Sequence, residues 1–123
     1  MAKIVLMSDD DGLRRDLRKL VRERGHSMRE QPALGLSQAN CLCPREPLDA
    51  AFLDLSTNGD GGLAVVALAR SRMPGIRIAV IDGGRGCDSL NRLARAVSLG
   101  ADDFMKKPIE VSDAADVLER LGL

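Results

Sequence analysis

Hydrophobic residues along the chain fall into short continuous runs separated by longer segments of mixed character. Four such runs stand at residues 3–7 (KIVLM), 50–53 (AAFL), 76–81 (IRIAVI) and 103–105 (DFM). A short apolar run with polar residues at its ends is typical of a strand covered on both faces, as in a parallel sheet. Residues 26–31 (HSMREQ) are mostly polar and predict at best an edge strand. The pattern therefore predicts five strands.

The segments between these strands carry apolar residues at helical spacing. Leu13, Leu17, Leu20 and Val21 fall at i, i+4, i+7 and i+8, and Gly25 can end the helix that they define. A weaker helix is expected over residues 34–43. Similar stripes predict three later helices: Leu63, Val66 and Ala67; Leu90, Leu93 and Val97; and Val111, Ala114, Ala115, Leu118 and Leu121. Five strands that alternate with five helices through short connections predict a doubly wound α/β domain.

The composition fits one folded domain with no strongly charged partner. The 123 residues are 45% hydrophobic and 29% charged, and 18 basic side chains balance 18 acidic ones. A nucleic-acid backbone is met by a basic excess, so no direct nucleic-acid contact is expected. No apolar run reaches about 18 residues and no secretory signal is present, which favours a cytoplasmic protein without membrane contact. Three cysteines and a single histidine, His26, favour reduced thiols and no zinc site.

Polar residues follow four of the predicted strands. Ser8-Asp9-Asp10 ends the first strand, Asp54 the third and Asp82 the fourth, and Lys107 follows the fifth. Ligands of such a sheet bind beyond the carboxyl ends of its strands, so these side chains are expected at one edge. Clustered carboxylates repel one another unless a cation neutralises them, and magnesium prefers oxygen ligands. Each acid by itself could equally be a helix cap, but all of them together predict a site.

Three segments carry a resemblance to a known family. Residues 100–109 read GADDFMKKPI, residues 53–55 (LDL) are followed by 60–63 (DGGL), and Leu13-Arg14 stands before Gly25. Together they resemble the CheY-like receiver domain of two-component response regulators, over essentially the whole chain. The resemblance implies a single receiver domain over residues 1–123. It also implies a five-stranded parallel sheet of order 2-1-3-4-5 with helices on both faces.

The resemblance also implies a mechanism. Asp54 would be the phosphoacceptor in a phosphorelay and would take phosphate from a phosphohistidine of a kinase or phosphotransfer protein. Magnesium would be held by Asp9, Asp54 and the backbone carbonyl of Ser56. Lys107 would stabilise the phosphoryl group, and the peptide bond between Lys107 and Pro108 would be cis. Such a domain is not an enzyme beyond its own dephosphorylation.

Three positions depart from the family pattern. A gap-free match puts Ser8 where the family has the first of two acids, with Asp9 as the second. A shift by one residue would restore the pair as Asp9 and Asp10, so Asp10 is an alternative metal ligand. Asp82 stands where the family has a switch hydroxyl, and Phe104 replaces the usual switch tyrosine. Magnesium is therefore expected to bind weakly, because a hard cation loses affinity as ligand charge falls.

Other functions remain open at this level. A receiver fold that docks partners without phosphorylation would explain Ser8 and Asp82. Asp9-Asp10-Asp11-Gly12 resembles the nucleophile motif of haloacid-dehalogenase-type phosphatases, although that function leaves Asp54 unexplained. Because the last predicted helix reaches Leu123, output is expected through a protein target or further phosphotransfer if the chain is complete. A homodimer through the fourth and fifth helices is a further expectation.

Overall fold

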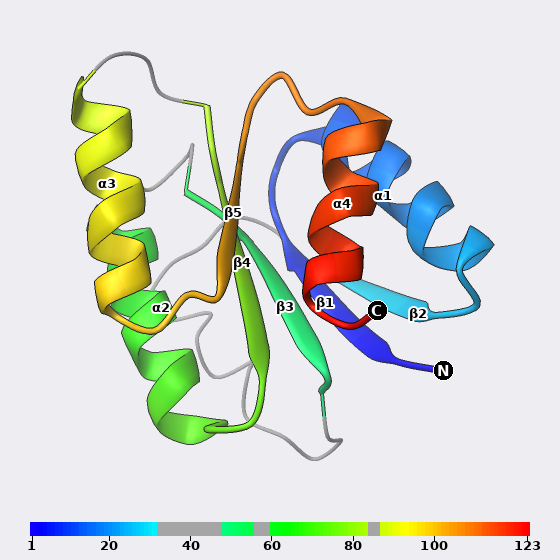
Figure 1. Ribbon diagram of the computed structural model, residues 1–123, viewed down its shortest axis with the longest axis horizontal. Coiled ribbons are helices and arrows are strands. Elements are labelled where there is room, and N and C mark those ends of the chain that lie inside the picture. The colour runs from blue at the N-terminus through cyan, green and yellow to red at the C-terminus, as the bar shows by residue number, and fades with distance from the viewer. Residues whose placement is uncertain (32–47, 56–59, 84–86) are drawn as a thin grey trace.

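The computed structural model describes residues 1–31, 48–55, 60–83 and 87–123. Its centre is a parallel sheet of order β2-β1-β3-β4-β5 (Figure 1), as the sequence predicted. The edge strand β2 is the polar one and pairs with β1. The strands are β1 (Lys3–Met7), β2 (Ser27–Gln31), β3 (Ala50–Asp54), β4 (Arg77–Asp82) and β5 (Asp103–Lys106).

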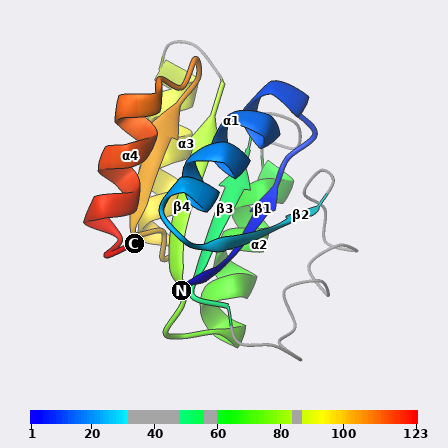
Figure 2. The ribbon, with the colours of Figure 1, turned by 90° about the vertical axis from the view of Figure 1, so that its right-hand side faces the viewer.

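Helices cover both faces of the sheet, as expected for right-handed crossovers between parallel strands. One face carries α1 (Asp11–Glu23) and α4 (Val111–Arg120), and the other carries α2 (Asp60–Arg72) and α3 (Cys87–Ser98) (Figures 1 and 2). The weaker helix predicted over residues 34–43 lies outside the described residues. Within the described ranges, every helix is too short or too polar to cross a membrane.

The two faces of the sheet bury two separate cores. Successive strand residues point to opposite faces, so Ile4 and Leu6 pack beneath α1 and α4 while Val5 and Met7 pack beneath α2 and α3. In β3 the same alternation sends Phe52 toward α1 and α4. Because both faces are covered, the central strands are almost wholly apolar, and this is why their runs were visible in the sequence.

The apolar stripe that predicted α3 is buried only in part. Leu93 is buried beneath the helix, whereas Leu90 is 61% exposed and Val97 48% exposed. Ala96 takes the second inward position, since residues three apart share a helix face. The stripe thus predicted the helix correctly but not which of its residues face the sheet.

Candidate functional site

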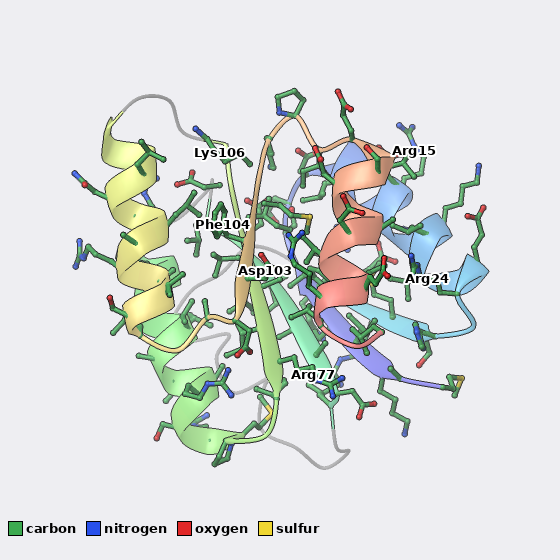
Figure 3. All side chains as sticks on the ribbon, viewed as in Figure 1. Arg15, Arg24, Arg77, Asp103, Phe104 and Lys106 are labelled. Atoms are coloured by element: carbon green, nitrogen blue, oxygen red, sulfur yellow. The ribbon has the colours of Figure 1, made fainter. Side chains whose placement is uncertain are left out.

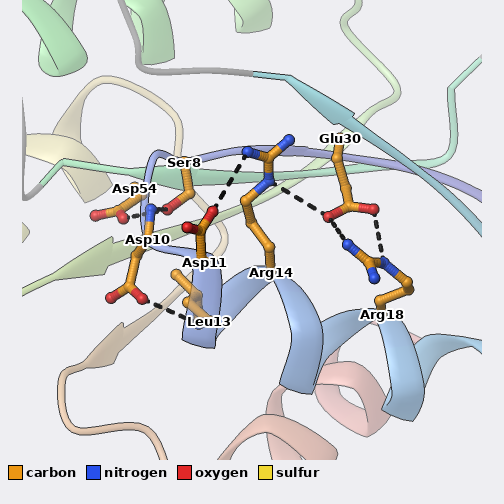
Figure 4. Close-up of polar contacts among 8 residues, drawn as sticks. All are labelled: Ser8, Asp10, Asp11, Leu13, Arg14, Arg18, Glu30 and Asp54. Carbon is orange, nitrogen blue, oxygen red and sulfur yellow. Dashed lines mark hydrogen bonds and ion pairs between the residues drawn. The ribbon is translucent and has the colours of Figure 1, made fainter.

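The register of the sheet brings Ser8 beside Asp54. Met7 pairs with Leu53 across β1 and β3, so the next residues, Ser8 and Asp54, lie next to each other. The pleat turns both toward the face that α1 and α4 cover. Their side chains are buried, each 1% exposed, and the Ser8 hydroxyl donates a 2.5 Å hydrogen bond to Oδ2 of Asp54 (Figure 4). The serine thus contacts the predicted phosphoacceptor directly.

Lys107 supplies the positive charge of this cluster. Its backbone N–H donates to the Asp82 carbonyl, and its Nζ reaches the α1 side of the sheet, 2.9 Å from Oδ2 of Asp54 and 2.9 Å from Oδ2 of Asp10. Burial by itself lowers the pKa of the ammonium, but the hydrogen bonds to Asp10 and Asp54 outweigh it and raise the pKa above its ordinary value. The lysine therefore stays charged. The Lys107–Pro108 peptide bond is cis.

Asp10 joins the cluster while it also caps a helix. Its Oδ1 accepts a hydrogen bond from the Leu13 N–H at the start of α1, and its own N–H donates to the Ser8 hydroxyl. The hydrogen bond from Lys107, followed by that from Leu13, holds the pKa of Asp10 below its ordinary value. The Asp10 carboxylate therefore caps α1 and contacts Lys107 at the same time.

The metal ligands suggested by the resemblance are distributed less simply. Asp9 is exposed on the loop between β1 and α1, whereas its neighbour Asp10 contacts Lys107. Ser56 lies outside the described residues. Within the described part of the chain, no three acidic, histidine or cysteine side chains converge as a metal cage. Two carboxylates with a carbonyl and waters still suit magnesium, which usually keeps several waters.

Asp82 belongs to the other face of the sheet. Asp54 pairs with Ile81, so Asp82 is one residue further along β4 and the pleat turns it toward α2 and α3. Its side chain is 0% exposed, and its Oδ2 lies 3.5 Å from Nε of Arg92 on α3. Sequence reasoning missed Arg92 because an arginine within a helix looks like an ordinary surface residue. A buried acid at a strand end, however, calls for a cation on the helix that covers it.

The other predicted switch position lies at the surface. Phe104 on β5 is half exposed between α3 and α4, and Lys106 two residues later is also exposed (Figure 3). Phe104 therefore does not pack into the core of this conformation. Phe104 lies on β5, the strand that leads to Lys107, and β5 pairs with β4, which ends in Asp82.

A groove opens next to the cluster, between α1 and the segment that leads into α4. Its volume is about 470 Å³, and it shares Asp10 and Lys107 with the cluster. Its walls are largely apolar, and Asp16 and Glu110 add further acids to its lining. A partner of apolar and basic character would therefore fit beside Asp54.

Comparisons with known proteins agree with this picture. No family model matches the chain. It is 30% identical over 106 residues to the alginate biosynthesis transcriptional regulatory protein AlgB of Pseudomonas syringae pv. tomato, covering 86% of this chain and 22% of that protein. It is 31% identical over 121 residues to the acid tolerance regulatory protein ActR of Rhizobium meliloti, covering 96% and 57%. The chain thus spans about a fifth of AlgB and little more than half of ActR.

Solved structures share the fold over nearly the whole chain. A response regulator from Thermotoga maritima matches with a TM-score of 0.83 at 17% identity, over 100% of this chain and 99% of that one. A Burkholderia pseudomallei response regulator, solved with a phosphorylated aspartic acid, a calcium ion and citrate, matches with a TM-score of 0.74 at 23% identity, over 97% and 72%. The chain thus has the fold of solved response-regulator receiver domains, and its sequence is similar to part of AlgB and of ActR.

Proposed function

We propose that Asp54 accepts a phosphoryl group from a phosphohistidine of a partner kinase or phosphotransfer protein. One observation carries the proposal: a buried aspartate at the carboxyl edge of the sheet is held between a hydroxyl donor, Ser8, and an ammonium group, Lys107. The hydrogen bond from Ser8 and the positive charge of Lys107 stabilise the carboxylate before transfer. The Burkholderia relative of the fold carries its phosphate on an aspartic acid.

The transfer is an in-line displacement in which positioning and charge neutralisation do most of the work. A carboxylate oxygen of Asp54 forms a bond to phosphorus as the phosphorus–nitrogen bond of the phosphohistidine breaks. The imidazole leaves with the electron pair of that bond. The product is an acyl phosphate with about −1.5 to −2 charge at neutral pH, and Lys107 is placed to pair with its oxygens. Later hydrolysis of the acyl phosphate would be the only turnover of the domain.

Magnesium is the metal that this donor set favours. Asp54, the Ser56 carbonyl and either Asp9 or Asp10 would hold it. Bound there, it would offset the negative charge of the phosphoryl oxygens. The Burkholderia response regulator was solved with a calcium ion, which is also a divalent cation that prefers oxygen ligands. We expect weak binding because Ser8 brings no charge to the site.

The groove beside the cluster is where we place the phosphodonor. Its lining includes Asp10 and Lys107, so a partner segment seated there would bring a phosphohistidine to Asp54. Residues 1–123 would act as one cytoplasmic receiver unit whose output is another protein. Exposed apolar side chains on α3, β5 and α4 offer a surface for that target or for a second copy: Leu90, Val97, Phe104 and Val111.

The test is phosphorylation by a small-molecule phosphodonor with magnesium, read by intact mass. The native protein should gain one phosphoryl group, and Asp54→Asn should gain none. Asp116→Asn serves as the control, because Asp116 is an exposed aspartate of α4 outside the cluster. Phosphate on Asp54→Asn would overturn the assignment. A folded native protein that takes no phosphate would instead favour phosphorylation-independent docking.

A further inference from the structure

Asp82 is a fully buried carboxylate that lies against a cation of α3. Its Oδ2 lies 3.5 Å from the Nε of Arg92, and the Arg92 side chain is 24% exposed. A carboxylate without access to water is unfavourable unless a positive charge compensates it. Arg92 provides that charge on the face of the sheet covered by α2 and α3.

The position of Asp82 makes its charge important for Asp54. The two aspartates end adjacent strands, β3 and β4, and Asp82 is one residue beyond the partner of Asp54. Neighbouring strands lie about 4.8 Å apart, so a phosphoryl group on Asp54 extends along the same edge as Asp82. It adds about −1.5 to −2 charge there. Without compensation, Asp82 would oppose phosphorylation by like-charge repulsion.

Two cations at this edge contact different acids. Nζ of Lys107 contacts Asp54 and Asp10, whereas the guanidinium of Arg92 contacts Asp82. They also lie on opposite faces of the sheet, Lys107 toward α1 and Arg92 on α3. With Asp82 neutralised from α3, the charge of Lys107 remains directed at the phosphoacceptor.

We propose that Arg92 is a positioning residue for phosphorylation of Asp54: its guanidinium, 3.5 Å from the buried Asp82 carboxylate, holds that carboxylate toward α3 and offsets its charge. The inference rests on the proposed function of Asp54. Arg92 touches neither the phosphoryl group nor its donor in this role. By offsetting the charge of Asp82, it reduces the repulsion between that carboxylate and a phosphoryl group on the neighbouring strand end.

The experiment is a double-mutant cycle on the steady-state phosphorylated fraction, with a fixed small-molecule phosphodonor and magnesium. Arg92→Ala should lower the ratio of phosphorylated to unphosphorylated protein about fivefold, because the buried Asp82 charge then opposes the phosphoryl group without an offset from α3. Asp82→Thr alone should not lower it. In the Asp82→Thr background, Arg92→Ala should then have no further effect, because no carboxylate remains to be held.

Matched variants separate this role from a purely structural one. Arg92→Lys retains the positive charge and should recover most of the phosphorylated fraction. Arg15→Ala removes an exposed arginine of α1, outside the site, and should behave as the native protein (Figure 3). Arg92→Gln replaces Arg92→Ala if the alanine variant does not fold, since it retains a long polar side chain. Circular dichroism of each variant reports folding.

Each outcome supports or overturns the inference. An unchanged phosphorylated fraction in Arg92→Ala, or an equal loss in the Asp82→Thr background, overturns it while leaving the proposed function intact. Phosphate on Asp82→Thr but none on the native protein also overturns it, because Arg92 then fails to offset Asp82. No phosphate on any variant overturns the proposed function and the inference with it.

Discussion

The two ends of the sheet use charged side chains in different ways. At the amino end, the guanidinium of Arg70 donates to the backbone carbonyls of Gly100, Pro74 and Ile76 and to the carboxylate of Asp102. At the carboxyl end, Lys107 and Arg92 contact carboxylates of other side chains instead, as described above.

The cluster around Arg70 holds backbone segments in place, whereas the cluster around Lys107 consists of contacts between side chains. A charge bonded to backbone carbonyls fixes the loops that carry those carbonyls, and its loss leaves them without partners. A charge bonded to other side chains can be redistributed when a new anion arrives, without any change in the backbone. Arg70 therefore belongs to the fold, whereas the contacts of Lys107 with Asp54 would, in the proposed function, rearrange around a phosphoryl group.

The largest expected effect on stability comes from breaking the amino-end cluster. Arg70→Ala should lower the free energy of unfolding by about 3 kcal/mol, because several carbonyls and the Asp102 carboxylate lose a charged donor together. Asp54→Asn should stay within about 1 kcal/mol of the native protein, since an amide oxygen still accepts from Ser8 and Lys107 while the burial of a charge is relieved. Urea denaturation of both variants measures the difference.

The opposite ranking would contradict the comparison. If Asp54→Asn destabilises the protein more than Arg70→Ala, the carboxyl-end charges are structural and the amino-end ones are dispensable. Arg15→Ala is the control for removal of an arginine, because its side chain is exposed and its loss should change stability little.

An intermediate effect is expected at Ser8, which the resemblance aligns with an acidic position. Ser8→Asp should tighten magnesium binding roughly tenfold, because it adds a negatively charged oxygen ligand beside Asp54. It also removes the hydroxyl that donates to Asp54, so the metal-free variant should be less stable than the native protein. Magnesium should then restore its stability. Calorimetric titration and thermal melts with and without magnesium measure both effects.

Ser8→Asn is the matched control, because it has the same shape as the aspartate without its charge. It should bind magnesium no more tightly than the native protein. If Ser8→Asp also fails to tighten binding, Asp10 already fills the role of the missing acid. The alignment that places Ser8 at the acid position would then be wrong by one residue.

The sequence revealed most of the fold because both faces of this sheet are covered. Continuous apolar runs marked β1, β3 and β4, and the polar residues that ended them marked the edge where Ser8, Asp54 and Lys107 meet. Strand ends are readable in this way since the chain direction alone brings them together in a parallel sheet.

What the sequence could not reveal depends on which side of the sheet a residue faces. The contact between Asp82 and Arg92 joins a strand end to the middle of a helix, and no spacing rule links the two positions. Lys107 contacts Asp10 rather than the exposed Asp9 because Asp10 is the N-cap of α1. At this helix start the side chains of adjacent residues point in different directions. Register and pleat decide both.

The smallest expected effect concerns an ion pair away from both ends of the sheet. Arg18 on α1 binds Glu30 on β2 through Nε and Nη2, at 2.8 and 2.6 Å, and Arg14 approaches the same carboxylate at 3.3 Å (Figure 4). The hydrogen bond from Arg18 lowers the pKa of Glu30 below its ordinary value of 4.5. Since the folded pKa is the lower one, the stabilisation is present above 4.5 and is lost as the pH falls through the folded pKa.

Glu30→Gln should therefore be slightly less stable than the native protein at neutral pH, and the difference should vanish on acidification. Urea denaturation from about pH 7 to about pH 3 follows it, across the range in which a glutamate titrates. Glu23→Gln, at an exposed glutamate near the end of α1, is the matched control. A difference between Glu30→Gln and the native protein that stays constant with pH would mean that packing, not charge, joins α1 to β2. In that case the charge of Glu30 would contribute nothing to the contact between this helix and this edge strand.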